Sequence, residues 1–186
     1  MIYDRQVAQR GVRSLTIEYP TQQNVLDSLQ EDHARFSRLI NHLSEEQQQI
    51  AFTPEGWSVR DFLAHTAHWK AATLKLITAY THDQPLPPVM PSGDEANAEA
   101  REVDKALSLP QVRNYWEETH VSFIHLVADD LDDEKLRDEV RPPWDGSPDM
   151  PLCAIIADIC GHDAEHFEVI EQYFEIPDNL EIEEQG

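Results

Sequence analysis

The stretch Gly56-Trp-Ser-Val-Arg-Asp-Phe-Leu-Ala-His65-Thr-Ala-His-Trp69 contains the clearest helix start in the chain. Ser58 and Asp61 have the spacing of a capping box, in which two side chains satisfy free N–H groups of the first turn. Apolar residues then recur at helical spacing to about Tyr80, and His65 lies among aromatic residues on this inward stripe. The stretch therefore predicts a buried helix that carries a histidine on its inner face.

Three further segments show the same helical periodicity, from about Thr21 to Leu43, from Pro110 to Leu131 and from Pro151 to Phe174. Four amphipathic helices without convincing strands predict an all-α four-helix bundle. The segment Thr81–Leu109 is rich in Pro, Asp, Glu and Asn and has little apolar periodicity. We expect it to be a long connection, which permits a crossover between parallel second and third helices.

The domain organisation follows from these segments. A chain of 186 residues has the usual size of one domain. We expect an N-terminal arm or short helix over residues 1–20, the bundle over 21–174 and an acidic tail over 175–186. Cys153 and Cys160 lie in one predicted helix, roughly 10 Å apart along its axis, and are expected to be reduced core residues rather than a disulfide.

Charge excludes some classes of partner. The chain has 36 acidic and 14 basic residues, a formal net charge of −22, and no Lys/Arg cluster. Such a surface repels phosphate backbones and anionic lipids, so we expect neither nucleic-acid nor membrane binding. The N-terminus has no apolar stretch with a cleavage site, and no uncharged run approaches transmembrane length. A cytoplasmic location is expected.

Histidine spacing predicts a metal site. His162 and His166 are four residues apart, which places both on one helix face at a spacing that suits chelation of one ion. The pair alone is equally compatible with two separately satisfied histidines. His65, from another helix, would complete three ligands with an open position, the usual plan of a catalytic metal.

Other histidines fit this role less well. His68 faces about 60° away from the His65 stripe and is the second choice for the third ligand. His33 is an inward but lone histidine, and Glu117-x-x-His120 is one copy of an element that di-iron bundles use twice. The string from His162 to His166 also matches inverted zinc peptidases, but only twenty residues follow it.

The segment from Gly56 to Trp69, taken with Ile159-Cys-Gly-His-Asp-Ala-Glu-His166, resembles the DinB/YfiT-like superfamily over about Thr21 to Phe174. The resemblance implies a bundle of down-up-up-down topology, with a long crossover between helices two and three. It also implies metal ligation by His65, His162 and His166. The start of helix two and the loop around Asn97–Arg101 are in addition similar to the ClbS/DfsB-type branch.

The resemblance implies metal-dependent chemistry on a small molecule. Similar proteins include metal-dependent transferases of low-molecular-weight thiols, mycothiol-dependent maleylpyruvate isomerases and bundles that protect against reactive metabolites. We expect one divalent metal, zinc first with nickel, iron or copper as alternatives, that activates a thiol or a water against a small electrophile. The alternatives are a non-catalytic binder of small molecules and a structural bundle with vestigial ligands. A homodimer is also implied.

Helix phase suggests supporting residues. An apolar pocket of Phe36, Trp69 and Trp116 is expected at the open coordination position. Glu165 is a candidate for proton transfer, and Asp158 is a candidate acceptor that orients His162. For both carboxylates a solvent-exposed helix position is the preferred explanation.

Overall fold

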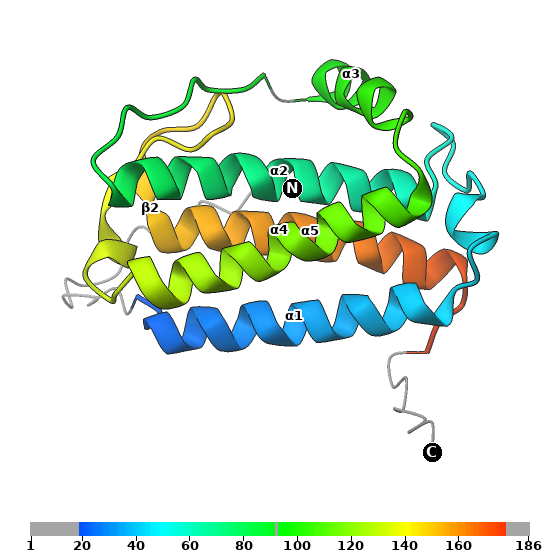
Figure 1. Ribbon diagram of the computed structural model, residues 1–186, viewed down its shortest axis with the longest axis horizontal. Helices are drawn as coiled ribbons and strands as arrows, with labels where there is room; N and C mark the ends of the chain where they lie inside the picture. The colour runs from blue at the N-terminus through cyan, green and yellow to red at the C-terminus, as the bar shows by residue number, and fades with distance from the viewer. Residues whose placement is uncertain (1–18, 92, 178–186) are drawn as a thin grey trace, which may run out of the picture.

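A computed structural model describes residues 19–91 and 93–177 of the chain (Figure 1). Within this part lie α1 (Gln22–His42), α2 (Val59–Thr81), α3 (Asp94–Asp104), α4 (Leu109–Asp130) and α5 (Leu152–Tyr173), with short 3₁₀ helices at Gln47–Gln49 and Lys135–Arg137. The strands β1 (Glu139–Val140) and β2 (Met150–Pro151) form a small antiparallel ladder. The sequence did not indicate this ladder, because strands of two residues leave no periodic pattern. Most of the expected N-terminal arm, residues 1–18, and most of the expected acidic tail, residues 178–186, lie outside the described residues.

Side-chain caps explain where the helices begin. The Ser58 N–H donates to the Asp61 carboxylate at 3.0 Å, and the Ser58 hydroxyl accepts from the Asp61 N–H at 3.2 Å. This is the capping box predicted for α2. Thr21 caps α1 through a reciprocal arrangement with Asn24, and Thr21 is the predicted N-cap. Both helices therefore start where the sequence places them.

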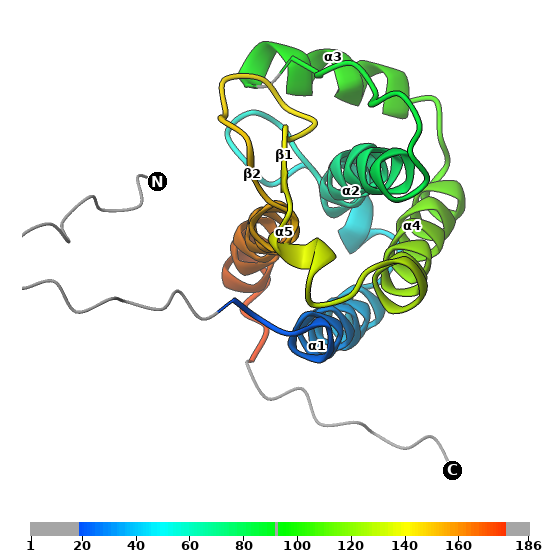
Figure 2. The same ribbon diagram turned by 90° about the vertical axis from the view of Figure 1, so that its left-hand side faces the viewer.

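The four long helices form a ring. α2 and α4 run in the same direction, whereas α1 and α5 run in the opposite one (Figure 1). Around the ring α1 packs against α4 and α5, and α2 packs against the same two helices, so α1 lies diagonally opposite α2 (Figure 2). This arrangement confirms the predicted down-up-up-down bundle, with a crossover between α2 and α4.

The core consists of two apolar clusters, one at each end of the bundle. One contains Leu29, Leu76, Phe123, Leu152 and their neighbours, and the other contains Phe36, Leu63, Val112, Phe167 and theirs. Between them lies a layer of buried polar side chains from the middle of the helices, including Lys70, His120 and Asp163. A buried polar layer is unusual because each unpaired polar group inside a protein is destabilising.

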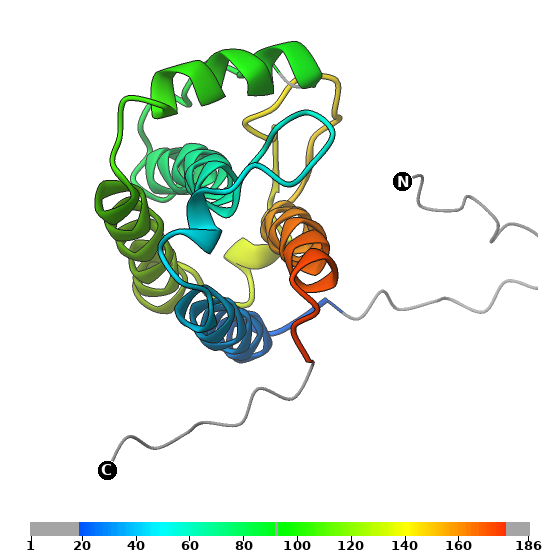
Figure 3. The same ribbon diagram turned by 90° about the vertical axis from the view of Figure 1, so that its right-hand side faces the viewer.

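The crossover differs from the prediction. It was expected to be an irregular connection, but it contains the 11-residue helix α3, which lies outside the ring and over α2 (Figures 2 and 3). Arg101 attaches α3 to the start of α2. Its guanidinium donates to the Glu55 carbonyl at 3.2 Å, to the Gly56 carbonyl and to the Asp61 carboxylate at 3.1 Å, and it covers the Trp57 ring. A helix this short is marginal alone, so tertiary contacts rather than apolar periodicity decide that it forms.

Two further features bear on the sequence-based expectations. Cys153 and Cys160 are free thiols, as predicted. Over residues 19–91 and 93–177, none of the helices has both the length and the apolar character needed to cross a bilayer.

Candidate metal centre

Three histidine side chains meet where α2 passes α5. His65 comes from α2 and is 4% exposed, and His162 and His166 lie one turn apart on α5. The Nε2 atom of His162 is 3.1 Å from Nε2 of His65 and 3.1 Å from Nε2 of His166. The structure thus brings together the three residues that the sequence predicts as ligands, and it turns the same ring atom of each toward a common point.

Burial keeps two of these imidazoles neutral. Desolvation, followed by the proximity of the other imidazoles, lowers the pKa of His65 to about 3 and that of His166 to about 4. At neutral pH each of these two rings therefore has one nitrogen whose lone pair is available to a metal. The three ligand nitrogens all lie within 4.8 Å of one another. A compact set of imidazole nitrogens from three histidines fits a divalent ion such as zinc.

Aromatic rings pack around the histidines and limit their rotation. The Trp57 ring meets His65 edge-on with centroids 5.3 Å apart, and the Phe62 ring lies 4.8 Å from that of His166. The Trp69 ring is also nearly perpendicular to that of His65, with centroids 6.5 Å apart. Because packed rings restrict the rotamers of their neighbours, this surround preorganises the cluster.

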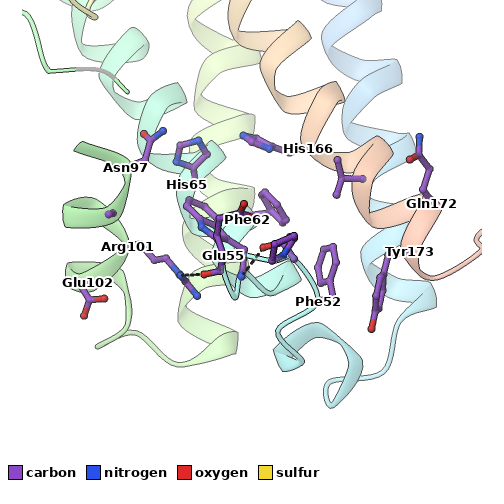
Figure 4. A pocket seen from close by; sticks show the side chains of 15 residues that line it. Phe52, Glu55, Phe62, His65, Asn97, Arg101, Glu102, His166, Gln172 and Tyr173 are labelled. Carbon is purple, nitrogen blue, oxygen red and sulfur yellow. Dashed lines mark hydrogen bonds between the residues drawn. The ribbon is translucent and has the colours of Figure 1, made fainter. Parts of the chain in front are cut away.

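The cluster borders a large pocket of about 840 Å³ between α2, α3, α5 and the loop that precedes α2 (Figure 4). His65 and His166 line it on one side. Its aromatic wall consists of Phe52, Trp57, Phe62 and Tyr173. Its polar residues include Glu55, Asn97, Arg101, Glu102 and Gln172. The pocket is large enough for a drug-sized molecule and offers that molecule a mainly apolar surface beside the histidines.

A second, smaller pocket of about 310 Å³ lies on the other side of the cluster. It is lined by His162 together with Trp69, Trp144, Asp158 and Ile159, and it shares Asn97 of α3 with the larger pocket. The histidine cluster therefore has access to two pockets, and α3 borders both of them.

The expected pocket of Phe36, Trp69 and Trp116 is wrong for two of its members. Trp69 does line the smaller pocket, but Phe36 and Trp116 line neither of the two. They are 1% and 3% exposed in the apolar core, where Phe36 stacks on Phe167 with centroids 3.8 Å apart. Phe36 belongs to α1, which lies diagonally opposite α2 (Figure 2), and Trp116 belongs to α4. Neither of these helices contributes a residue to the two pockets.

Asp158 does not orient His162 as expected. It is exposed, lines the smaller pocket and makes no hydrogen bond to that ring among the described residues. The carboxylate nearest to the free ring nitrogen is that of Asp163, with Oδ1 at 3.9 Å from His162 Nδ1. Helical spacing favours Asp158, one turn before His162, as its partner. The structure instead buries Asp163, the next residue after His162, which is 1% exposed.

The remaining candidates lie away from the cluster. His68 is only half-buried, in agreement with its lower rank. His33 stacks on His120 at 4.4 Å and contacts Glu117 at 2.9 Å, so these three residues form a separate group. Glu165 is exposed and lines neither pocket, and its role in proton transfer stays a prediction.

Several residues around the site were missed by sequence reasoning. Arg101 stood out only through the resemblance, although a lone arginine in a mostly acidic segment is a visible signal. Lys70 is a lysine on the inward stripe of α2, and that conflict with the apolar pattern could have indicated a buried partner. The loop residues Phe52 and Trp57 left no periodic signal.

Fold and site together define a class: a down-up-up-down four-helix bundle with a three-histidine cluster in the groove between its second and last long helices. The chain belongs to the DinB superfamily, whose family model matches residues 28–170. A comparison with curated protein sequences finds no significant relative.

Solved structures agree with this fold. YfiT from Bacillus subtilis, described as a probable metal-dependent hydrolase with an unusual four-helix bundle topology, is 16% identical with a TM-score of 0.63, over 91% of this chain and 92% of its own. DfsB, described as a sibling lethal factor precursor, is 15% identical with a TM-score of 0.66, over 85% and 97%. A mycothiol-dependent maleylpyruvate isomerase is 17% identical with a TM-score of 0.64, over 78% of this chain but only 58% of its own. At these identities the likeness concerns the fold alone.

Proposed function

We propose that this protein binds one divalent metal ion through His65, His162 and His166 and uses it in transferase or hydrolase chemistry on a small electrophile. The observation that carries the proposal is the convergence of three Nε2 atoms, with 3.1 Å between His162 and each of the others, at the border of a large pocket. Three protein ligands leave a coordination position for a further ligand, as in catalytic zinc sites.

The chemistry follows from the ligand set. When bound, a divalent ion lowers the pKa of a water or thiol, so that a nucleophile exists at neutral pH. The three histidines would ligate the ion. Trp57 packs against His65 and Phe62 packs against His166, which restricts the rotation of both rings. The aromatic wall of the large pocket binds the apolar part of the electrophile and excludes water from it. Zinc is the first choice of metal, with nickel or iron as alternatives.

Metal content of untagged protein, measured by plasma mass spectrometry, tests the site. We expect close to one equivalent in the wild type and almost none in His65→Ala, His162→Ala or His166→Ala. His68→Ala is the matched control, because it removes a half-buried histidine from the same helix without touching the cluster. Circular dichroism verifies that each variant folds.

Two outcomes contradict the proposal. If the folded wild type takes up no metal after addition of zinc, nickel or iron, the proposed metal site does not exist. If His68→Ala loses the metal and His65→Ala keeps it, the third ligand is His68 and the proposed assignment of His65 is wrong. If the metal is present, thiols and electrophiles are then screened for turnover that chelation abolishes and metal restores.

A non-catalytic function is the alternative, and the large pocket supports it. A volume of about 840 Å³ with four aromatic residues in its wall suits tight binding of a small molecule whether or not a metal is present. Such a protein would sequester a toxic metabolite. Stoichiometric protection that saturates at one ligand per chain, without product, favours this function, whereas repeated turnover by the metal-loaded protein excludes it.

A further inference from the structure

Three charged or titratable side chains meet in the polar layer between the two apolar clusters, each from a different helix. Lys70 of α2, His120 of α4 and Asp163 of α5 are 2%, 1% and 1% exposed. Lys70 Nζ lies 2.5 Å from Asp163 Oδ2 and 2.9 Å from His120 Nδ1. His120 Nε2 in turn lies 3.0 Å from the carbonyl oxygen of Leu29 on α1. The group therefore links all four helices of the ring.

Hydrogen-bond chemistry assigns the protons in this group. A carbonyl oxygen only accepts, so His120 donates from Nε2 to Leu29 and its Nδ1 must be the acceptor from Lys70. Burial and then the Lys70 charge lower the pKa of His120 to about 3, which keeps the ring neutral. Burial opposes the charge on Asp163, but Lys70 and His162 together outweigh burial, so the pKa of this carboxyl lies below its usual range. The group is a neutral histidine beside an ammonium–carboxylate pair.

Stability does not explain this pair. Removing two charges from water is unfavourable, and well-packed apolar residues often stabilise a bundle as well or better. The pair lies between the two apolar clusters. Its position gives a different reason, because the free oxygen of Asp163 faces the histidine cluster.

The link to the cluster is a pair of buried atoms without partners. Asp163 Oδ1 and His162 Nδ1 are both shielded from solvent, and neither has a hydrogen-bond partner among the described residues. They are 3.9 Å apart, so a small rotation of the imidazole brings them to hydrogen-bond distance. An imidazole that ligates through Nε2 carries its proton on Nδ1 and needs an acceptor there, which is commonly a carboxylate.

We propose that Asp163 is the positioning residue that orients His162 for metal binding, and that Lys70, itself held by His120, fixes the Asp163 carboxylate for this task. The inference rests on the proposed metal site and extends it to two residues that do not touch the metal. Its consequence is that metal affinity depends on Lys70 and Asp163, which are buried in the interior of the bundle. Asp163→Asn and Lys70→Met should both weaken metal binding, although their side chains lie beyond the ligands.

The test compares metal affinity with stability in Asp163→Asn, Lys70→Met and the double variant. Affinity for zinc is measured by competition with a chromophoric chelator, and stability of the metal-free proteins by urea unfolding. We expect each single variant to lose about 10- to 100-fold in affinity. Because Lys70 acts through Asp163, the double variant should lose about as much as one single variant and not the product of both losses.

Stability should follow a different pattern. Each single variant leaves one buried charge or polar group without its partner and should unfold at lower urea, whereas the double variant is neutral and should recover much of the loss. A double variant that is stable again but still weak in metal binding is the expected signature of positioning. It is also the variant that keeps the test informative if the single variants do not fold. Glu168→Gln, which removes an exposed carboxylate from α5, controls for the change in net charge.

The results that overturn the inference are distinct. If the folded double variant binds zinc as tightly as the wild type, the pair is only structural and Asp163 does not position His162. If Glu168→Gln weakens binding as much as Asp163→Asn, the effect is one of net charge. If the wild type binds none of zinc, nickel and iron, the proposed function fails and this inference fails with it. Titration of the wild type with each metal reveals that outcome before any variant is made.

Discussion

At the scale of single residues, the buried histidines are the feature that most affects behaviour. His65 and His120 are 4% and 1% exposed, and His166 is half-buried. Burial is the largest cause of the lowered pKa in all three, to about 3, about 3 and about 4. In the unfolded chain the same residues return to an ordinary histidine pKa of about 6.5. Folding therefore keeps three imidazoles neutral over a pH range in which the unfolded chain takes up protons.

This difference predicts acid sensitivity of the metal-free protein. Below about pH 6.5 the unfolded state binds more protons than the folded state, so the free energy of unfolding falls as pH falls, down to the folded pKa values. The stabilisation by neutral histidines is complete above pH 6.5. At pH 5.5 each histidine should lower stability by about 1 kcal/mol relative to pH 7.5. Urea unfolding of metal-free protein across this range measures the slope.

His120→Gln isolates one contribution to that slope. It removes a histidine that is no candidate metal ligand, so the pH dependence between 7.5 and 5.5 should become shallower by about a third. His125→Gln, whose side chain is 72% exposed, should leave the slope unchanged. Equal slopes in both variants and the wild type would show that the buried histidine gains its proton in the folded state.

At the scale of elements, the start of α2 and the helix α3 depend on the same carboxylate. Asp61 accepts from Ser58 in the capping box, from Arg60 at 3.0 Å and from Arg101 at 3.1 Å. One side chain thus starts the helix that carries His65 and attaches the helix that borders both pockets. Local capping and tertiary attachment are joined at this residue.

Arg101→Ala should release α3 without unfolding the bundle. The variant removes the hydrogen bonds and the contact with Trp57 that attach the helix, and α3 lies outside the ring. Amide hydrogen exchange in residues 94–104 should accelerate about tenfold, while the centre of α2 keeps its protection. Lys105→Ala, which removes a lysine paired with an exposed glutamate, is the control and should change neither. Unchanged exchange in Arg101→Ala would show that other contacts hold α3.

Phe36→Leu tests the assignment of α1 to the core and not to the pocket. The ring is 1% exposed and stacks on Phe167, so the smaller side chain should lower the free energy of unfolding by about 1 kcal/mol. Metal affinity and small-molecule binding should stay as in the wild type. Phe52→Leu is the counterpart, because Phe52 lines the large pocket and should affect ligand binding more than stability. If Phe36→Leu impaired ligand binding and Phe52→Leu impaired only stability, Phe36 would belong to the pocket and not to the core.

At the scale of the whole molecule, the histidine cluster joins two helices that are far apart in the chain. His65 and His162 are separated by 97 positions in sequence. An ion bound there connects the second and the last helix of the ring. It binds the folded state only, because the unfolded chain does not bring the ligands together. Binding should therefore stabilise the bundle as a whole.

Zinc should raise the melting temperature of the wild type. At a free concentration of a hundred times the dissociation constant the gain is about 2.7 kcal/mol, equivalent to roughly 5 to 10 °C for a chain of this size. Differential scanning calorimetry with zinc and with chelator measures the shift. His166→Ala, folded but with two ligands, should show little of it. An equal shift in that variant would mean that zinc binds elsewhere.

The sequence determined the parts of this protein that depend on local patterns. Apolar periodicity located the four long helices, the Ser58–Asp61 pair marked the start of α2, and the spacing of His162 and His166 placed both on one face of α5. These features involve residues within one or two helical turns, so that the spacing along the chain already contains their geometry. The third histidine needed only the assumption that α2 and α5 are neighbours.

Tertiary structure decided everything that depends on which faces meet. It placed Phe36 and Trp116 in the core and not at the pocket, and it selected Asp163 in place of Asp158 as the carboxylate near His162. It also formed α3, through an arginine whose partners lie in another segment. Helix phase says that a side chain points inward, but the order of helices around the ring decides which neighbours it meets there, and that order depends on packing between segments far apart in the chain.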